Sequence, residues 1–419
     1  MSLIKPFAGL RPAPGRAAEV AAPPYDVMNA EEARRMVEGR PWSFLHISRP
    51  EVDLPVNTDP YSPTVYAKAR ENLDRMLAKG VLMRDIEPHY YVYRLTMGEH
   101  RQTGLVATAS VAAYDAGRIK KHEFTRPEKE DDRVRQIAAL DAQTGPVFLV
   151  YQADPEIDAR LAQSCHAVAE VDLTGADGVR HEIWSIDDAA TIRWLSMRFD
   201  TFDALYVADG HHRSAAASRI AADRRGPELN PDKPQHATAD ASHQYFLSVI
   251  FPHHQMQILP YNRVVRDLNG FDTADFMQRL SAAFQIQSSD TPVQPAVPAE
   301  FGMYLDRHWY RLVLDSQRIP SDDPVARLDV SLLQDNLIEP ILGIVDPRRD
   351  QRIDFVGGIR GLDGLAARVD SGEMRVAFSL HATRMDDLMA VADAGQVMPP
   401  KSTWFEPKLA DGLVSHVID

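Results

Sequence analysis

Five consecutive residues have types that together could hold a phosphate, and they read Asp209, Gly210, His211, His212 and Arg213. The flanking pattern predicts a strand at Ala204–Ala208, a tight turn, and a helix over Ser214–Arg224. Unpaired backbone N–H groups at such a turn attract anions, and Gly210 lets a ligand approach the backbone. Two imidazoles and a guanidinium favour a phosphate over a neutral ligand. The alternative is an ordinary strand-to-helix turn, capped by Asp209, with two solvated histidines.

A second candidate site is the charge-rich stretch over residues 120–133, where eleven of fourteen side chains are ionisable. Pro127 divides it into a loop and a helix that we expect to start near Asp131 or Asp132. The loop could present His122 and Glu123 to a cleft, with Glu123 as a general base or Mg²⁺ ligand. We expect His122, Glu123 and Arg133 to lie near the Asp209–Arg213 turn. The alternative is a solvated cluster of charges.

Two lysines near the C-terminus, Lys401 and Lys408, flank hydroxyl and aromatic residues between prolines. Such a stiff segment could clamp a phosphate chain, so we expect one or both lysines to fold back to the turn. A docking strand with surface lysines explains the segment equally well. Another stiff segment, Pro23-Pro24-Tyr25-Asp26, makes Asp26 a weaker candidate and Tyr25 a packing residue.

Two histidine pairs, His211-His212 and His253-His254, suggest a metal site. Adjacent histidines on a strand point to opposite faces, so neither pair alone can chelate one ion. A zinc site would need one member of each pair together with Glu123 or Asp209. The favoured ion is instead Mg²⁺, held by Glu123 and Asp209.

The secondary-structure signals predict a mixed α/β fold with two domains. Asn29 and Glu32 form a capping box for a helix that ends near Gly39, and a second helix runs from Ser62-Pro63 to Gly80. A hairpin is expected around residues 98–102. The Pro- and Asp-rich stretch Gly226–Ser242 is the expected linker. We therefore predict an αβ domain over 1–230, and a second αβ domain over 243–419 into which the C-terminal segment docks.

Composition excludes several classes of protein. The 419 residues carry a formal net charge of −14, which disfavours binding to nucleic acid. A single cysteine rules out an internal disulfide, which favours the cytoplasm. No signal peptide, long apolar run or GxxxxGK[ST] loop occurs, so we expect neither secretion, nor a membrane partner, nor a P-loop.

The turn motif resembles the nucleotide-binding turn of the ParB/sulfiredoxin superfamily, whose free-serine kinases carry nearly the same five residues. The match covers about forty residues, and the expected helix–strand–helix order around the turn agrees with it. The resemblance implies a ParB/sulfiredoxin-like nucleotide-binding region packed with a second αβ region. It also makes serine the first guess for a substrate.

Nearly the whole chain resembles the uncharacterised family called domain of unknown function 1015. The segments that carry this resemblance are the N-terminal Ala22-Pro23-Pro24-Tyr25-Asp26-Val27, the central His122-Glu123 and Asp132-Arg133, and the C-terminal Met398-Pro399-Pro400-Lys401-Ser402-Thr403-Trp404-Phe405-Glu406-Pro407-Lys408-Leu409. The resemblance implies a bacterial or archaeal cytoplasmic protein and no particular reaction.

These observations predict a nucleotide-dependent phosphotransferase or nucleotide hydrolase that acts on a small hydroxylated metabolite. ATP or ADP with Mg²⁺ would be the cofactor, and Glu123 or Asp209 the base, with His122 as a further catalytic candidate. The alternatives are a ParB-like nucleotide-gated regulatory protein, a metal-dependent hydrolase, and a scaffold with a vestigial site. We also expect Arg213 to be exposed, so that its replacement by Ala removes nucleotide binding while barely changing the melting temperature.

Overall fold

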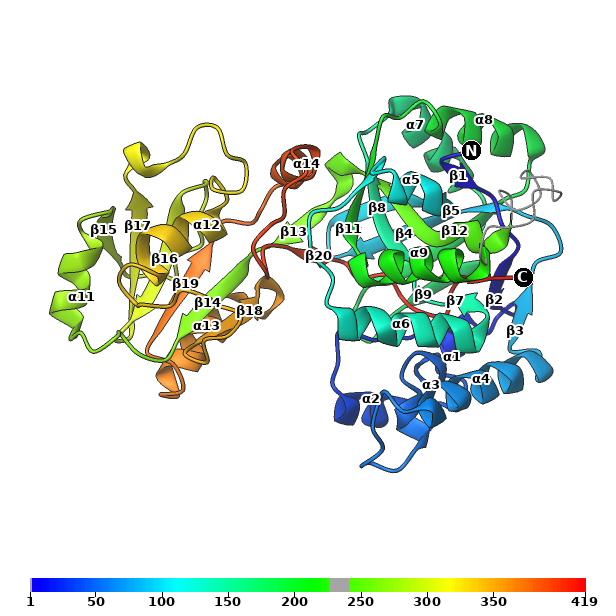
Figure 1. The fold of residues 1–419 in the computed structure, drawn as a ribbon, viewed down its shortest axis with the longest axis horizontal. Helices are drawn as coiled ribbons and strands as arrows, with labels where there is room; N and C mark the ends of the chain where they lie inside the picture. Colours follow the sequence, from blue (N-terminus) through cyan, green and yellow to red (C-terminus); the bar gives the residue numbers. More distant parts are fainter. Residues whose placement is uncertain (1, 226–240) are drawn as a thin grey trace. The chain divides into compact units, whose positions relative to one another are not determined.

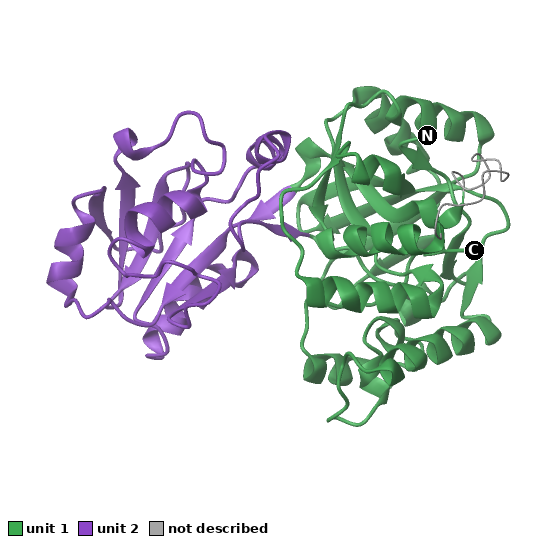
Figure 2. Cartoon of the chain, viewed as in Figure 1, with its two compact units in different colours: residues 1–256, 407–419 green, residues 257–406 purple. Residues whose placement is uncertain are grey.

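The computed structural model describes residues 2–225 and 241–419, which form two compact units. Unit 1 contains residues 1–256 and 407–419, and unit 2 contains residues 257–406 (Figure 2). This division differs from the predicted domains of 1–230 and 243–419 for two reasons. Residues 245–252 form a strand in the middle of the unit 1 sheet, and the last thirteen residues return to unit 1. Most of the predicted linker, residues 226–240, lies outside the described residues.

A nine-stranded mixed sheet is the framework of unit 1 (Figure 1). Strand β1 (Ile4–Lys5) pairs with β5, and the remaining strands lie in the order β6 (Ile119–Lys120), β11 (Leu205–Asp209), β8 (Val147–Tyr151), β12 (Tyr245–Pro252), β5 (His100–Ser110), β4 (Tyr90–Met97), β10 (Arg180–Ile186) and β9 (Val171–Thr174). The pairs β6–β11 and β8–β12 are parallel, and the other pairs are antiparallel. The mixed α/β fold class is thus confirmed, and so is the hairpin, where Met97 pairs with His100.

Helices build outward from this sheet in layers. Helix α9 (His211–Arg225) packs on β8 and β12, α6 (Pro127–Leu140) packs on α9, and α4 (Pro63–Ala78) packs on α6 (Figure 1). The other helices of unit 1 are α1 (Ala17–Val20), α2 (Ala30–Val37), α3 (Leu45–Ser48), α5 (Val111–Asp115), α7 (Pro155–Ser164) and α8 (Ala189–Phe199). Helix α6 begins at Pro127, earlier than predicted, because proline at the first helical position loses no helical hydrogen bond.

Helix α2 begins with the capping box that the sequence predicts. The Asn29 side chain accepts from the Glu32 N–H, and the Glu32 carboxylate accepts from the Asn29 N–H. This capping box confirms the predicted helix start, because it satisfies two backbone donors that the first turn leaves without partners.

A small four-stranded sheet joins both ends of the chain in unit 1. Its order is β3 (Leu82–Arg84), β2 (Gly9–Pro12), β21 (Ser415–Val417) and β7 (Ala142–Gln143). The C-terminal strand therefore lies between β2 and β7, two strands from the first half of the chain. Just before β21 in the chain, the backbone of Asp411 pairs with Ala22 in an isolated antiparallel bridge.

Unit 2 has a six-stranded antiparallel sheet with the order β15 (Phe284–Ser289), β17 (His308–Leu314), β16 (Glu300–Leu305), β19 (Val376–Leu380), β14 (Tyr261–Val265) and β18 (Ile353–Gly357). A separate pair joins β13 (Gln257–Leu259) to β20 (Trp404–Glu406). The helices are α11 (Thr273–Leu280), α12 (Asp329–Leu333), α13 (Gly361–Asp370) and α14 (Met385–Asp393). Leu365 of α13 packs against Val264 and Ala377 of the sheet.

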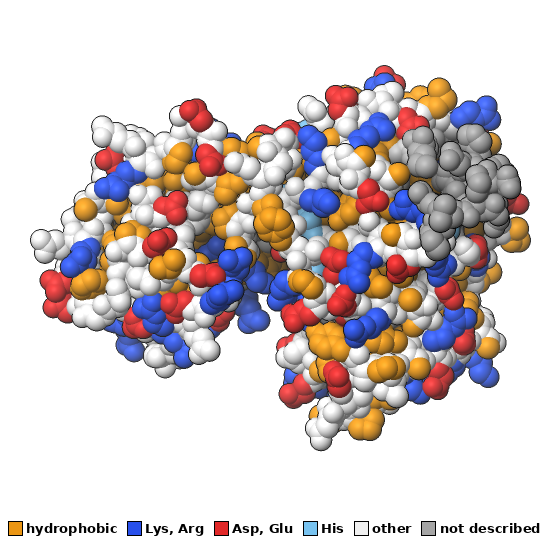
Figure 3. All heavy atoms as spheres, viewed as in Figure 1, with side chains coloured by type: hydrophobic (Ala, Val, Ile, Leu, Met, Phe, Trp, Pro, Cys, Tyr) orange, Lys and Arg blue, Asp and Glu red, His pale blue; other side chains and the backbone are white. Residues whose placement is uncertain are grey.

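Charged side chains of both signs are visible on each unit (Figure 3). On the face shown in Figure 3, acidic and basic side chains are interspersed over each unit. Within the described residues, none of the helices combines the length and the apolar character needed to cross a membrane.

Candidate functional site

The predicted turn lies where the sequence places it, between β11 and α9 of unit 1. Val207 in the strand is completely buried, and Gly210 has a φ of 97° that side-chain-bearing residues rarely adopt. The Ser214 N–H already donates to the Gly210 carbonyl, so the helix starts directly after the glycine. The first N–H groups of α9 have no acceptor within the helix, which leaves them for an anion.

Asp209 is surrounded by cations. Its Oδ2 lies 3.6 Å from Lys408 Nζ and accepts from Arg213 Nη2 at 3.3 Å, while its Oδ1 accepts from the Gly210 N–H at 2.9 Å. Burial opposes ionisation of Asp209, but Lys408 and Arg213 outweigh it and lower the pKa of the carboxyl well below its ordinary value. Lys408 therefore folds back to the turn, as expected for one of the two C-terminal lysines.

Arg213 is not the exposed side chain that the sequence suggests. It is 10% exposed, and its Nη1 donates to the Pro146 carbonyl while Nη2 donates to Asp209. The expected exposure is therefore wrong, and it was the reason for expecting that replacement of Arg213 would barely change the melting temperature. Helix α9 packs on β8 and β12 in the interior of the sheet, so Arg213 is enclosed by tertiary structure that the local sequence pattern does not reveal.

A small cavity adjoins the turn. Its volume is about 30 Å³, room for one or two waters, and its wall includes Tyr25, Arg133, Arg213 and Asp411. The Arg133 guanidinium lies 3.8 Å from the centre of the Tyr25 ring, and Arg133 donates twice to the Asp132 carboxylate. Two arginines from different helices thus line one space beside the start of α9.

The sequence reasoning missed Asp411. It follows Lys408 in the C-terminal segment, and its backbone pairs with Ala22, which brings its side chain beside Arg213. Burial raises the pKa of this carboxyl to about 7, against the opposing influence of Arg213. The proximity of Asp411 to Lys408 was the only signal in the sequence that could have pointed to it.

Asp411 should make unfolding depend on pH. Its folded pKa of about 7 exceeds the ordinary 3.8, so the native state binds the proton more tightly, and this contribution to stability is lost as the pH rises towards 7. The wild type should therefore be more stable relative to Asp411→Asn at pH 5 than at pH 7.5. Urea unfolding of both proteins at the two pH values measures the difference. A difference that does not change with pH would contradict the raised pKa.

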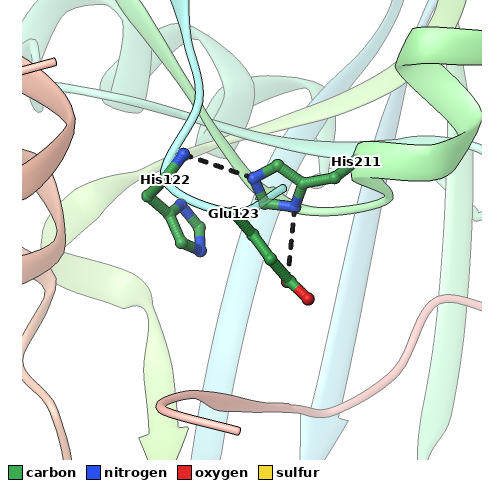
Figure 4. A group of neighbouring side chains, drawn as sticks. All are labelled: His122, Glu123 and His211. Carbon is green, nitrogen blue, oxygen red and sulfur yellow. Dashed lines mark hydrogen bonds and ion pairs between the residues drawn. The ribbon is translucent and has the colours of Figure 1, made fainter. Parts of the chain in front are cut away.

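His122 and Glu123 also reach the turn (Figure 4). The His122 N–H approaches His211 Nε2 at 3.5 Å, the two imidazole rings meet edge to face at 4.5 Å, and Glu123 Oε2 lies 3.8 Å from His211 Nδ1. Burial lowers the pKa of His122 to about 4, and burial together with the His122 ring lowers that of His211 well below its ordinary value. Both rings are therefore neutral at physiological pH.

The remaining predicted residues have other contacts. His212 Nε2 accepts from the Arg126 N–H at 3.0 Å, and His253 Nδ1 accepts from the Ala153 N–H at 2.9 Å. Lys401 belongs to unit 2, where its Nζ lies 5.2 Å from the centre of the Tyr261 ring and its carbonyl accepts from Arg263. Its role in phosphate binding stays a prediction.

A comparison with protein families gives a match over most of the chain. The model of the family described as "Protein of unknown function (DUF1015)" matches residues 4–331. That range includes the turn, the His122–Glu123 loop and Arg133. No curated protein matches the sequence.

Three solved structures show distant similarity. A free serine kinase with AMP bound is 12% identical, with 74% of this chain and 92% of that chain covered and a TM-score of 0.36. A conserved hypothetical protein from Pyrococcus furiosus is 13% identical, with coverages of 73% and 94% and a TM-score of 0.33. SbnI from Staphylococcus aureus, truncated at its C-terminus, is 11% identical, with coverages of 73% and 84% and a TM-score of 0.35. These similarities are too low to bear on the function of this chain.

Proposed function

The chain belongs to the DUF1015 family, and we propose that it binds a nucleoside di- or triphosphate at the Asp209–Arg213 turn and transfers or hydrolyses a phosphoryl group. The observation that carries the proposal is the Gly210 turn at the start of α9, with Arg213 and Arg133 beside it. Backbone N–H groups, the helix dipole and guanidinium groups together favour a phosphate chain.

Local charge supports this assignment in a chain whose net charge is −14. A surface of that charge repels nucleotides unless cations gather at the binding site. Arg133, Arg213 and Lys408 come from three separate segments and converge on the turn. Lys408 and Arg213 also hold Asp209 in its ionised form, so the turn keeps one carboxylate among its cations.

The acceptor in the proposed reaction is the hydroxyl group of a small metabolite, with serine as the first candidate. Phosphoryl transfer asks the protein mainly for positioning and for stabilisation of the phosphate charge. Glu123, whose side chain is about half exposed, or Asp209 would accept the hydroxyl proton. Mg²⁺ would bridge the phosphates and one of these carboxylates, since it is usually held by one or two carboxylates and the substrate.

Nucleotide binding can be measured by thermal shift. ATP or ADP with Mg²⁺, at about a hundred times its dissociation constant, should stabilise the protein by about 2.7 kcal/mol. Adenosine and inorganic phosphate at equal concentrations are the controls. The proposal requires a chain of phosphates attached to a nucleoside, so neither compound alone should give the same shift. If no nucleotide shifts the unfolding transition, the turn is structural and the proposal fails.

Turnover separates an enzyme from a regulatory protein. Incubation of the protein with ATP or ADP, Mg²⁺ and serine should yield a phosphorylated product and a nucleotide with one phosphate fewer. Binding without any turnover, with serine or with water, would favour the ParB-like alternative.

A further inference from the structure

His122 has a buried nitrogen without a hydrogen-bond partner among the described residues. The residue is 2% exposed and its ring hydrogen-bonds to the backbone of Val207, whereas Nδ1 has no hydrogen-bond partner in the part of the chain that the structure describes. A buried polar atom without a partner costs free energy, so one in a native structure calls for an explanation. A ring whose N–H donates to a backbone carbonyl presents a lone pair at its other nitrogen. Metal-binding histidines commonly have this arrangement.

Two further residues that can bind a metal ion lie close to His122. His122, Glu123 and His211 each offer a donor atom, and these atoms all lie within 4.8 Å of one another (Figure 4). Donors on a tetrahedral ion with bonds of about 2.0–2.2 Å lie roughly 3.4 Å apart, so the widest separation has to shorten by up to about 1.4 Å. Glu123, on a loop and 51% exposed, can supply that movement.

The donor set selects the kind of ion. Mg²⁺ prefers oxygen ligands in an octahedral arrangement, whereas two imidazoles and one carboxylate suit Zn²⁺ and other divalent first-row transition ions. Asp209 is not one of these three donors, and its carboxylate lies next to Lys408 and Arg213.

From this geometry we propose that His122, Glu123 and His211 bind a divalent transition-metal ion such as Zn²⁺, with or without nucleotide. Three protein donors leave at least one coordination position open to water or to a substrate oxygen. If the ion binds His211 through Nδ1, the ring must carry its proton on Nε2. The 3.5 Å contact between Nε2 and the His122 N–H then opens. That contact is at the limit of hydrogen-bond length, so little is lost.

The test is metal binding by the full chain in buffer without nucleotide. Protein treated with chelator is titrated with Zn²⁺, and with Mg²⁺ in parallel, by isothermal calorimetry. We expect one Zn²⁺ per chain and no displacement of it by millimolar Mg²⁺. His122→Asn, His211→Asn and Glu123→Gln should each weaken Zn²⁺ binding by about tenfold or more, because loss of a ligand costs at least as much as loss of an outer-shell partner.

His254→Asn is the matched control. His254 is 49% exposed and lies 3.8 Å from an Asp158 oxygen, outside the group of donors, so its replacement should leave Zn²⁺ affinity unchanged. Circular dichroism checks that each variant is folded. If the buried histidine variants unfold, Glu123→Gln decides, because its side chain is at the surface.

Two results would overturn the proposal. The first is equal Zn²⁺ affinity in Glu123→Gln and the wild type, which would mean that Zn²⁺ binds at adventitious surface histidines. The second is displacement of Zn²⁺ by Mg²⁺. Because no nucleotide is present, either result leaves the phosphate proposal untouched. A protein that binds Zn²⁺ but shows no nucleotide shift would leave the metal site in place and remove the phosphate site.

Discussion

Replacing Arg213 by Ala should lower the free energy of unfolding by about 3 kcal/mol, the lower end of the cost of breaking a buried ion pair. The guanidinium is 10% exposed and donates to both Asp209 and the Pro146 carbonyl. Its removal leaves that carbonyl without this donor and Asp209 with Lys408 as its remaining side-chain cation partner. We expect the loss of unfolding free energy to stay near the lower end of that range because Lys408 still offsets the negative charge of Asp209. Urea unfolding followed by circular dichroism measures the change.

The matched control lies on the same helix. Arg219 is 44% exposed and pairs with Glu130 and Asp131 at the surface, so Arg219→Ala should change stability by less than about 1 kcal/mol. Both substitutions place the same residue in α9, so helix propensity cancels in the comparison. Equal, small losses in the two variants would mean that the Arg213 contacts contribute nothing to the fold. Nucleotide binding is better tested with Arg213→Lys, which keeps the charge but loses the two-pronged donor.

Replacing Gly210 by Ala should remove nucleotide binding and also lower stability by about 1–2 kcal/mol through backbone strain. At a φ of 97° an added Cβ would lie 3.0 Å from Arg213 Nε and 3.1 Å from its Cζ. The guanidinium would have to move away from Asp209, and the methyl group would lie where the proposed phosphate approaches the backbone. We expect the nucleotide-induced thermal shift to disappear at concentrations that saturate the wild type.

Gly178→Ala separates strain from site disruption. Gly178 has a φ of 80°, and an added Cβ there would meet no atom within 4 Å. This control variant should lose stability by a similar amount yet keep the full nucleotide response. If the two variants respond equally to nucleotide, the Gly210 turn is not where the phosphates bind.

Features set by neighbouring residues could be predicted from the sequence. The Asn29–Glu32 capping box, the β4–β5 hairpin and the turn at Gly210 each depend on hydrogen bonds and backbone angles within a few positions. Such short-range preferences depend on neighbouring residues and not on the position of distant segments. The positions of His122 and Glu123 next to the turn were predicted from chemistry rather than from geometry, and the structure brings them to His211.

Only the tertiary structure decided how the cluster is enclosed. The pairing of β21 with β2 and β7 returns the C-terminal segment to unit 1, and this places Lys408 and Asp411 beside Arg213. The packing of α9 on the sheet buries Arg213, and burial sets the protonation of Asp411 and of both cluster histidines. No local pattern reports these effects, because desolvation depends on which distant segments cover a side chain. The sequence determined the chemical groups and the turn that carries them, while long-range strand pairing determined which groups meet and which of them are charged.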